Sequence, residues 1–346
     1  MTVWTFVLAP LIVLPIVLLF RFVGCGIDAV GTKETPPVQP PPEPPPAVLP
    51  PPSQSPSQPP SDGKPPNYRK YILGETNNPG TVKHPTVVPK GADVIAYWRL
   101  VDVPAATQAH DEKGFQNGEY VSISPLTAIV PTATTGGSEA ASGKIETGKP
   151  GLIDSDPTAL SRFFNGGYVR IPYKPDLYTN EFTIEAWVLP RPLKLEYEHV
   201  LFDAGGRYAY QGSPVSDRGF RVFEDRKGHW QVRLFSTTAD LIAMPPLVPR
   251  PNRTHFALVM QNDGPGGVKK KVTLYLDGKA AGTANLNSYA RPDGASLFIG
   301  IENTTPAPTG PRTLRTPWLG QIQEVVLHKK ALSKEEIENH VDINRT

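Results

Sequence analysis

The chain has 346 residues, with 35 Lys and Arg against 33 Asp and Glu, and a formal net charge of +2. This charge is too small to indicate a nucleic-acid-binding protein, and no RRM, zinc-finger or helix-turn-helix pattern occurs, so no nucleic-acid partner is expected. A single cysteine, Cys25, excludes a disulfide within the chain and a cysteine-based metal site.

Residues 2–20, TVWTFVLAPLIVLPIVLLF, carry no charge. A helix of this length, at about 1.5 Å per residue, nearly spans a hydrocarbon core of ~30 Å. Pro10 and Pro15 would kink it, which membrane helices tolerate better than helices in water. Residues 1–24 are therefore predicted to be a signal peptide or a membrane anchor.

The run Phe22-Val23-Gly24-Cys25 follows this apolar segment and resembles a bacterial lipobox. The resemblance implies that Cys25 is a lipidation site. Phe22 replaces the usual Leu, and no basic residue precedes the apolar run, so an uncleaved anchor stays open as the alternative. Both interpretations place the protein at a membrane, on its extracytoplasmic side.

Residues 36–66 contain 16 prolines. Such a tract favours an extended spacer of roughly 100 Å at about 3.1 Å per residue, although proline-rich segments are also ligands for aromatic grooves. Residues 25–92 are predicted to be a disordered linker. Its turn-rich end, 67–92, has room for one docking strand.

The remainder, 93–343, reads as one all-β domain, because short runs with period-2 alternation are separated by Gly, Pro, Asn and Asp. In residues 181–190, EFTIEAWVLP, one face is expected to carry Phe182, Ile184, Ala186 and Val188. The opposite face is expected to carry Thr183, Glu185 and Trp187. This alternation is typical of a strand with one face in a core.

Turn and helix signals complete the domain. Asp277-Gly278 predicts a tight hairpin, since that turn requires positive φ at both central residues. Ser333 and Glu336 form a predicted capping box for a short C-terminal helix. Leu332 and Ile337 occupy the two positions of a hydrophobic staple.

Five stretches together resemble the concanavalin A-like, laminin G-like domain, in the order that this family uses: 96–120, 163–173, 181–190, 254–282 and 297–337. The resemblance implies a two-sheet antiparallel jelly-roll sandwich with ligand-binding loops at one rim. Four tryptophans are then expected to pack in the interior: Trp98, Trp187, Trp230 and Trp318. Glu185 is expected to be either solvated or part of a polar site on the sheet.

Glycoside hydrolases share this fold, so the fold alone does not exclude catalysis. Retaining enzymes need two carboxylates about 5–5.5 Å apart, and the enzymes of this family carry Glu-x-Asp-x-x-Glu. Here Thr183 stands between Glu181 and Glu185, which are about 13 Å apart along a strand. The chain is therefore predicted not to be an enzyme.

The seven histidines are scattered and form no HExxH or HxH motif, so no zinc site is expected. Glu336 and His340 are four residues apart on the C-terminal helix and are assigned to its solvated face. The only cofactor that the resemblance implies is calcium at a loop rim. Its candidate ligands are Asp203 and Asp217, although Asp is also a common turn residue.

The loop 205–219, GGRYAYQGSPVSDRG, is the predicted ligand-binding loop, because flat aromatic rings beside polar groups suit sugars and protein surfaces. Its candidate residues are Arg207, Tyr208, Tyr210 and Gln211. The sequence thus favours a membrane-tethered, extracytoplasmic, non-catalytic module that binds glycans or surface proteins. The alternative is a structural component that assembles into a cell envelope or appendage through the sandwich, and a glycoside hydrolase is disfavoured.

Overall fold

The computed structural model divides into two compact units, Met1–Gln58 and Pro59–Thr346. The residues it describes all lie in the second unit: 67–75, 91–123, 143–154, 160–191, 198–208, 216–225, 228–235, 240–243, 253–292, 294–303 and 314–345. No helix among them is long and apolar enough to cross a membrane. The predicted anchor, Cys25 and the proline-rich tract lie outside the described residues.

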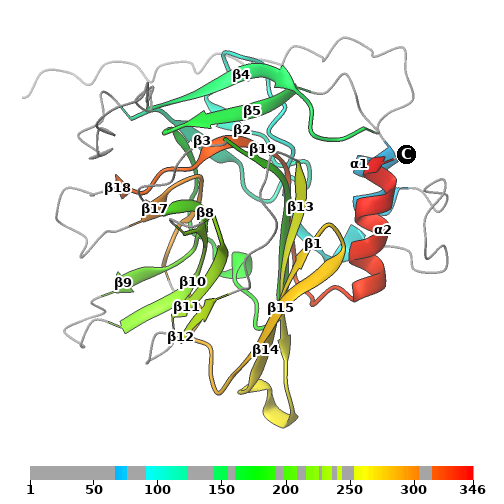
Figure 1. Cartoon of the computed structure of the whole chain (residues 1–346), viewed down its shortest axis with the longest axis vertical. Helices are drawn as coiled ribbons and strands as arrows, with labels where there is room; N and C mark the ends of the chain where they lie inside the picture. The colour runs from blue at the N-terminus through cyan, green and yellow to red at the C-terminus, as the bar shows by residue number, and fades with distance from the viewer. Residues whose placement is uncertain are drawn as a thin grey trace, which may run out of the picture. The chain divides into compact units, whose positions relative to one another are not determined.

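Two antiparallel sheets form the domain, as predicted (Figure 1). Within the described ranges the first has eight strands, in the order β15-β14-β13-β7-β19-β5-β4, with β1 also paired to β19. These strands are β1 (Val94–Trp98), β4 (Lys144–Pro150), β5 (Leu160–Asn165), β7 (Phe182–Pro190), β13 (Thr254–Asn262), β14 (Lys270–Leu276), β15 (Lys279–Leu286) and β19 (Leu319–His328).

The second sheet has nine strands in the described ranges, in the order β12-β11-β10-β8-β16-β6-β3-β2, with β9 also paired to β10. Its strands are β2 (Gln108–Ala109), β3 (Gly118–Val121), β6 (Tyr168–Ile171), β8 (His199–Asp203), β9 (Gly206–Tyr208), β10 (Ser216–Glu224), β11 (Trp230–Phe235), β12 (Asp240–Ala243) and β16 (Leu297–Ile299). A small separate ladder joins β17 (Glu302–Asn303) to β18 (Leu314–Arg315).

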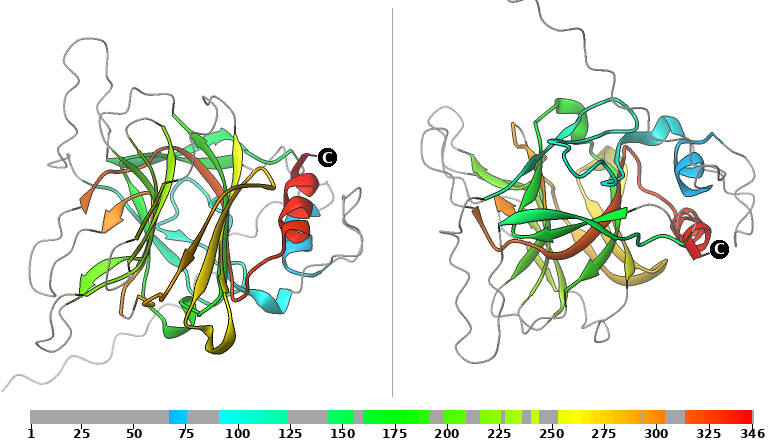
Figure 2. Two further views of the ribbon diagram at one scale, coloured as in Figure 1. Left: turned by 60° about the horizontal axis from the view of Figure 1, so that its bottom comes forward. Right: turned by 90° about the horizontal axis from the view of Figure 1, so that it is seen from above.

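The main core lies between the two sheets, which face one another in Figure 2. The predicted alternation of β7 is confirmed, because Phe182, Ile184, Ala186 and Val188 all belong to this core. Trp98, Trp230 and Trp318 are buried there too, and the rings of Trp230 and Trp318 stack with centroids 5.7 Å apart. Burial of each such side chain contributes roughly 1.5–3 kcal/mol, so this layer dominates the stability of the sandwich.

Two helices pack on the outer face of the eight-stranded sheet, away from the core (Figures 1 and 2). They are α1 (Asn67–Ile72) and α2 (Lys334–Arg345), and the described 3-10 turns are η1 (Gly91–Asp93), η2 (Pro175–Leu177) and η3 (Pro265–Gly267). Ile337 of α2 packs on Ala257 and Val259 of β13. Ile343 of α2 joins Tyr68, Tyr71 and Ile72 of α1 with Val326 of β19.

Helix α1 differs from the sequence prediction, which allowed a docking strand in 67–92. Tyr68, Tyr71 and Ile72 are completely buried, and their i, i+3, i+4 spacing puts them on one face of a helix. This face fits against α2 and β1, so tertiary packing determines the conformation of a six-residue segment that is too short to be helical alone.

The predicted local signals at the end of the domain are confirmed. Ser333 and Glu336 form the reciprocal capping box, with the Glu336 amide donating to the Ser333 hydroxyl at 3.2 Å and the Ser333 amide donating to the Glu336 carboxylate at 2.8 Å. Asp277 and Gly278 have φ of 50° and 77° in the β14–β15 hairpin. The domain therefore closes with a well-capped helix held against its sheet.

Candidate functional site

A buried polar cluster lies between the outer face of the eight-stranded sheet and helix α2. Its centre is Glu185, in the middle of β7 on the face opposite the core. The antiparallel register places His255 of β13 opposite Trp187, and His328 of β19 opposite Thr183. Directly opposed residues share a face of a sheet, so both histidines point to the same side as Glu185. His340 comes from α2.

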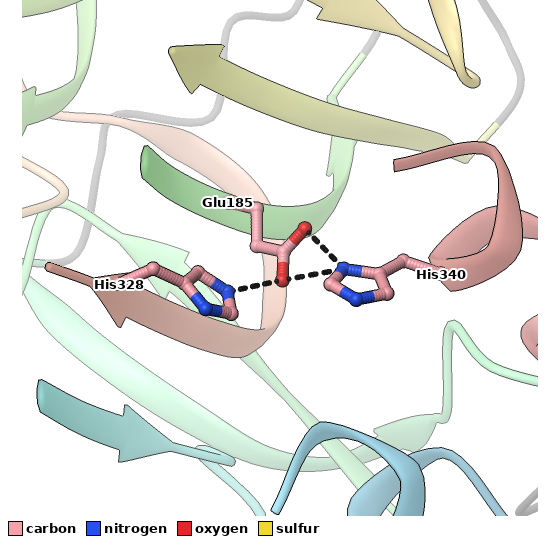
Figure 3. Close-up of side chains that lie close together, drawn as sticks. All are labelled: Glu185, His328 and His340. Atoms are coloured by element: carbon pink, nitrogen blue, oxygen red, sulfur yellow. Dashed lines mark hydrogen bonds and ion pairs between the residues drawn. The ribbon is translucent and has the colours of Figure 1, made fainter. Parts of the chain in front are cut away.

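Three imidazoles converge on the Glu185 carboxylate. His328 Nε2 lies 2.9 Å from Oε1, and His340 Nδ1 lies 2.9 Å from both carboxylate oxygens (Figure 3). His255 Nε2 lies 3.3 Å from Oε2. The side chains come from three adjacent strands and a helix, so the fold as a whole assembles the cluster.

The cluster is closed to solvent. Glu185, His255 and His340 are 0% exposed, and His328 is 2% exposed. Burial alone would raise the pKa of the Glu185 carboxyl, but the charge of His340 and the close approach of all three imidazoles outweigh it, so the pKa lies well below the usual value. Glu185 is therefore an ionised carboxylate in a dry environment.

Aromatic side chains of α1 cover the cluster. The rings of Tyr68 and Tyr71 meet the His340 ring edge-on, with centroids 6.4 Å and 5.8 Å away. Burial and the nearby Glu185 charge raise the pKa of the Tyr68 hydroxyl well above its usual value. Trp187 lies beside His255, with ring centroids 5.2 Å apart. Among the described residues, these rings enclose the cluster on the side of α1.

The donor set could hold a cation. Glu185, His328 and His340 each offer one ligand atom, and these three atoms lie within 4.8 Å of one another. All three side chains are buried. Imidazole nitrogen and carboxylate oxygen are the ligands that zinc and neighbouring transition metals take in proteins.

A second polar network lies on the nine-stranded sheet, around Arg221 of β10. Its Nη2 lies 3.0 Å from Asp203 Oδ2, and its Nη1 lies 2.7 Å from Glu302 Oε1. Asp203 also accepts a hydrogen bond from the Gly205 amide at 2.6 Å. Burial would lower the pKa of the Arg221 guanidinium, but the charges of Asp203 and Glu302 raise it overall. The network thus holds the positively charged Arg221 side chain between two carboxylates.

Comparison with known protein families gives a match for this domain. Residues 163–338 match the family described as the concanavalin A-like lectin/glucanases superfamily. The chain belongs to this superfamily. The comparison with curated proteins gives no match.

Several solved structures resemble the chain at low identity. Domain 4 of AbnA, a GH43 extracellular arabinanase from Geobacillus stearothermophilus in complex with arabinotriose, is 15% identical with a TM-score of 0.45, over 73% of this chain and 98% of that one. A Trypanosoma rangeli sialidase is 15% identical with a TM-score of 0.49, over 79% of this chain and only 37% of the sialidase. The CBM40 of a Ruminococcus gnavus sialidase, bound to α2,3-sialyllactose, is 16% identical with a TM-score of 0.37, over 47% of this chain and 83% of that one.

The loop residues predicted for ligand binding in this superfamily domain fall only in part on the described chain. Arg207 and Tyr208 lie in β9, and Arg207 pairs in register with Asp217 of β10. Tyr210 and Gln211 lie outside the described residues. Asp203 faces the Arg221 guanidinium rather than an open rim, so calcium at its Oδ2 would have to displace that group. The calcium site stays a prediction.

The superfamily domain's most unusual site was not predicted from the sequence. The assignment of Glu336 and His340 to a solvated helix face is wrong, because they are 8% and 0% exposed. His328 and His340 are 143 and 155 positions from Glu185, so no motif of fixed spacing could link them. Of the two alternatives for Glu185, the polar site is the one observed. The prediction that Trp187 is a packing residue is confirmed.

Proposed function

We propose that the protein is a non-catalytic binding module of the concanavalin A-like superfamily, held at a membrane by its N-terminal segment and recognising a glycan or a surface protein. The superfamily's description names both lectins and glucanases, so the two classes must be distinguished by the site. The observation that carries the proposal is the burial of Glu185 beneath α2.

A glycosidase needs carboxylates that touch the scissile bond. The run 181–185 comes nearest to the catalytic pattern of the family. Glu185 is enclosed by three histidines, and Glu181 accepts a hydrogen bond from the Asn262 amide at 2.8 Å at the end of the sheet. Glu185 is thus out of reach of a sugar, which leaves this run without the pair of carboxylates that a retaining enzyme uses.

The outer face of the nine-stranded sheet supports a binding role. A cross-sheet row runs in register through Glu119, Arg170, Phe298, Asp203, Arg221 and Arg233. Their neighbours Val169, Ile171, Phe220 and Val222 belong to the core, so alternation turns the row outward. Glu119 and Arg170 are the partly exposed end of the row, with side chains 49% and 32% exposed. Phe298, Asp203 and Arg221 in the middle of the row are buried. The groups that can hydrogen-bond to sugar hydroxyls or a polar protein surface are therefore those at its partly exposed end, Glu119 and Arg170.

The β9–β10 segment, which contains the predicted binding loop, adjoins the same sheet, because Ser216–Arg218 pair with Gly206–Tyr208 immediately before Arg221. The described loop residues Arg207 and Tyr208 therefore lie beside the strand that carries Arg221. This backbone position supports a ligand site that includes Tyr208, whereas Tyr210 lies outside the described residues.

A glycan array tests the proposal directly, with the full chain in detergent and with calcium or EDTA present. We expect binding that Tyr208→Ala, Tyr210→Ala or Arg170→Ala weakens roughly tenfold or more, equivalent to about 1.4 kcal/mol. Lys334→Ala is the matched control, because Lys334 is exposed on α2 over the other sheet. Absence of any hit in both buffers excludes the glycan ligand and leaves a protein ligand, to be sought by cross-linking on cells.

Catalysis and tethering need their own measurements. Release of sugar fragments from any bound glycan, detected by mass spectrometry, would overturn the non-catalytic assignment. The tether is tested by membrane fractionation and by incorporation of a labelled fatty acid into the wild-type chain and Cys25→Ser. A chain that stays in the aqueous fraction contradicts membrane attachment, whereas a membrane-bound Cys25→Ser chain supports the uncleaved anchor.

A further inference from the structure

We propose that Glu185, His255, His328 and His340 bind one zinc ion that fastens helix α2 to the outer face of the eight-stranded sheet. The site lies on the opposite sheet from the proposed ligand surface and is independent of it. The four side chains come from β7, β13, β19 and α2, so a single ion would cross-link the elements that form this layer of the domain.

The geometry is close to that of a zinc site. The donor nitrogens of His328 and His340 lie 2.9 Å from a Glu185 oxygen, and that of His255 lies 3.3 Å away. Tetrahedral zinc with bonds of about 2.0–2.1 Å separates its ligand atoms by roughly 3.3–3.4 Å. The distances from Glu185 to the three nitrogens therefore need to change by at most about half an ångström. The ligand atoms of Glu185, His328 and His340 already lie within 4.8 Å of one another, and the His255 ring would have to move closer to these two histidines to complete the four.

The unpaired ring nitrogens of His255 suit coordination of a metal ion. The ring is completely buried, and within the described part of the chain neither nitrogen makes a hydrogen bond. Buried polar atoms are nearly always paired, because an unpaired one costs about 1–3 kcal/mol. A zinc ion between Nε2 and the Glu185 carboxylate would satisfy Nε2 and compensate the buried negative charge.

The closed surroundings assign a structural rather than a catalytic role. Three imidazole nitrogens and one carboxylate oxygen fill a tetrahedral shell, whereas catalytic zinc keeps a position open for water or substrate. All four ligands are at most 2% exposed. Calcium and magnesium bind almost entirely through oxygen atoms, whereas this site offers three nitrogens and a single carboxylate.

The ion would also order the entry to the domain. His340 contacts Tyr68 and Tyr71 of α1 through its ring, and Tyr71 is hydrogen-bonded to Asn339 of α2 at 3.1 Å. Fixing His340 thus fixes the surface on which α1 docks. Because α1 directly follows the proline-rich segment, the zinc site would support the point where the tether joins the sandwich.

The test uses the full chain purified in detergent, with metal content measured by mass spectrometry before and after chelation. We expect about one zinc per chain, a fall in melting temperature when the ion is removed, and recovery when zinc is added back. His340→Gln and Glu185→Gln should weaken zinc binding roughly 100-fold or more, since loss even of a group supporting a ligand costs 10–100-fold. His199→Gln is the matched control, a buried histidine of β8 outside the cluster, and should keep full binding.

Cobalt substitution keeps the proposal testable if the variants fail to fold. Cobalt(II) in the wild-type site should show the intense visible spectrum of a tetrahedral complex, with nitrogen and oxygen ligands by X-ray absorption. A folded wild-type chain that takes up neither zinc nor cobalt, or binds cobalt with the weak spectrum of a six-coordinate ion, overturns the proposal. Equal zinc binding by His340→Gln and wild type would do the same.

Discussion

Glu324 interrupts strand β19 with a left-handed backbone, at φ 55°. The register between β19 and β7 shifts between Gln323 and Val326 at this point, which is the local distortion expected of a β-bulge. The side chain is completely buried and accepts hydrogen bonds from Arg99 Nε and Nη2, both at 3.2 Å, and from the Tyr97 hydroxyl. The bulge is thus stabilised by an ion pair that crosses from β19 to the segment following β1.

Replacement of the Glu324 carboxylate should strongly lower the free energy of unfolding. Glu324→Gln removes the negative charge that faces the buried Arg99 guanidinium, and breaking a buried pair typically costs about 3–5 kcal/mol. Chemical denaturation of the two proteins measures the loss. Glu119→Gln is the control: its pair with Arg170 is 3.8 Å long and partly exposed, so its removal should cost less than about 1 kcal/mol. Similar losses for both variants would contradict the role assigned to the buried pair.

His199 makes stability depend on pH. It is buried at the start of β8, and burial lowers its pKa from 6.5 to about 4. Because the unfolded chain binds this proton near pH 6.5 and the folded chain only near pH 4, its contribution is complete above pH 6.5 and is lost as the pH falls to about 4. The loss amounts to about 3 kcal/mol.

The pH dependence is measured as the free energy of unfolding of the wild type and of His199→Gln across this range. The carboxylates of the protein affect both curves equally, so their difference isolates the histidine. The variant should lose stability less steeply between pH 6.5 and 4. Parallel curves would show that His199 is not responsible.

At the scale of elements, helix α2 depends on its first turn. Ser333 and Glu336 cap each other, and loss of an N-cap side chain costs about 1 kcal/mol. Ser333→Ala should lower the free energy of unfolding by this amount and increase amide exchange at the start of α2. Lys334→Ala, which removes an exposed pair with Glu338 at 3.7 Å on the same helix, should change stability by only a few tenths of a kcal/mol. An exchange pattern unchanged in Ser333→Ala would mean that packing alone holds the helix.

The elements differ in how far their sequences predict them. β7 and the β14–β15 hairpin follow from local signals, because alternation and Asp277-Gly278 specify strand and turn without help from distant residues. α1 carries a weaker signal, the 68/71/72 spacing, beside a proline-rich tract that obscures it. The Glu185 cluster requires the register between β7, β13 and β19, which is set by packing of the whole sandwich. No local pattern in a single sequence contains that information.

At the scale of the whole molecule, α1 determines where the folded domain begins. Tyr68, Tyr71 and Ile72 are completely buried against α2 and β1, and Arg69 of α1 pairs with Glu112 at 2.9 Å. A domain beginning at residue 93, the predicted boundary, would expose Tyr97 and Ile343 and open the aromatic cover of the Glu185 cluster. The first residues after the proline-rich tract therefore contribute to the stability of the sandwich.

Two truncated chains measure this contribution. Residues 67–346 should unfold at the same denaturant concentration as residues 59–346, because the difference between them is only the end of the proline-rich tract. Residues 76–346 lack α1 and should lose about 2–4 kcal/mol, the scale of losing several buried apolar side chains after the cost of ordering them is deducted. Equal stability of all three would mean that α1 docks without stabilising the domain. A loss confined to the shortest chain would assign the contribution to α1, whose buried face packs on α2 and β1.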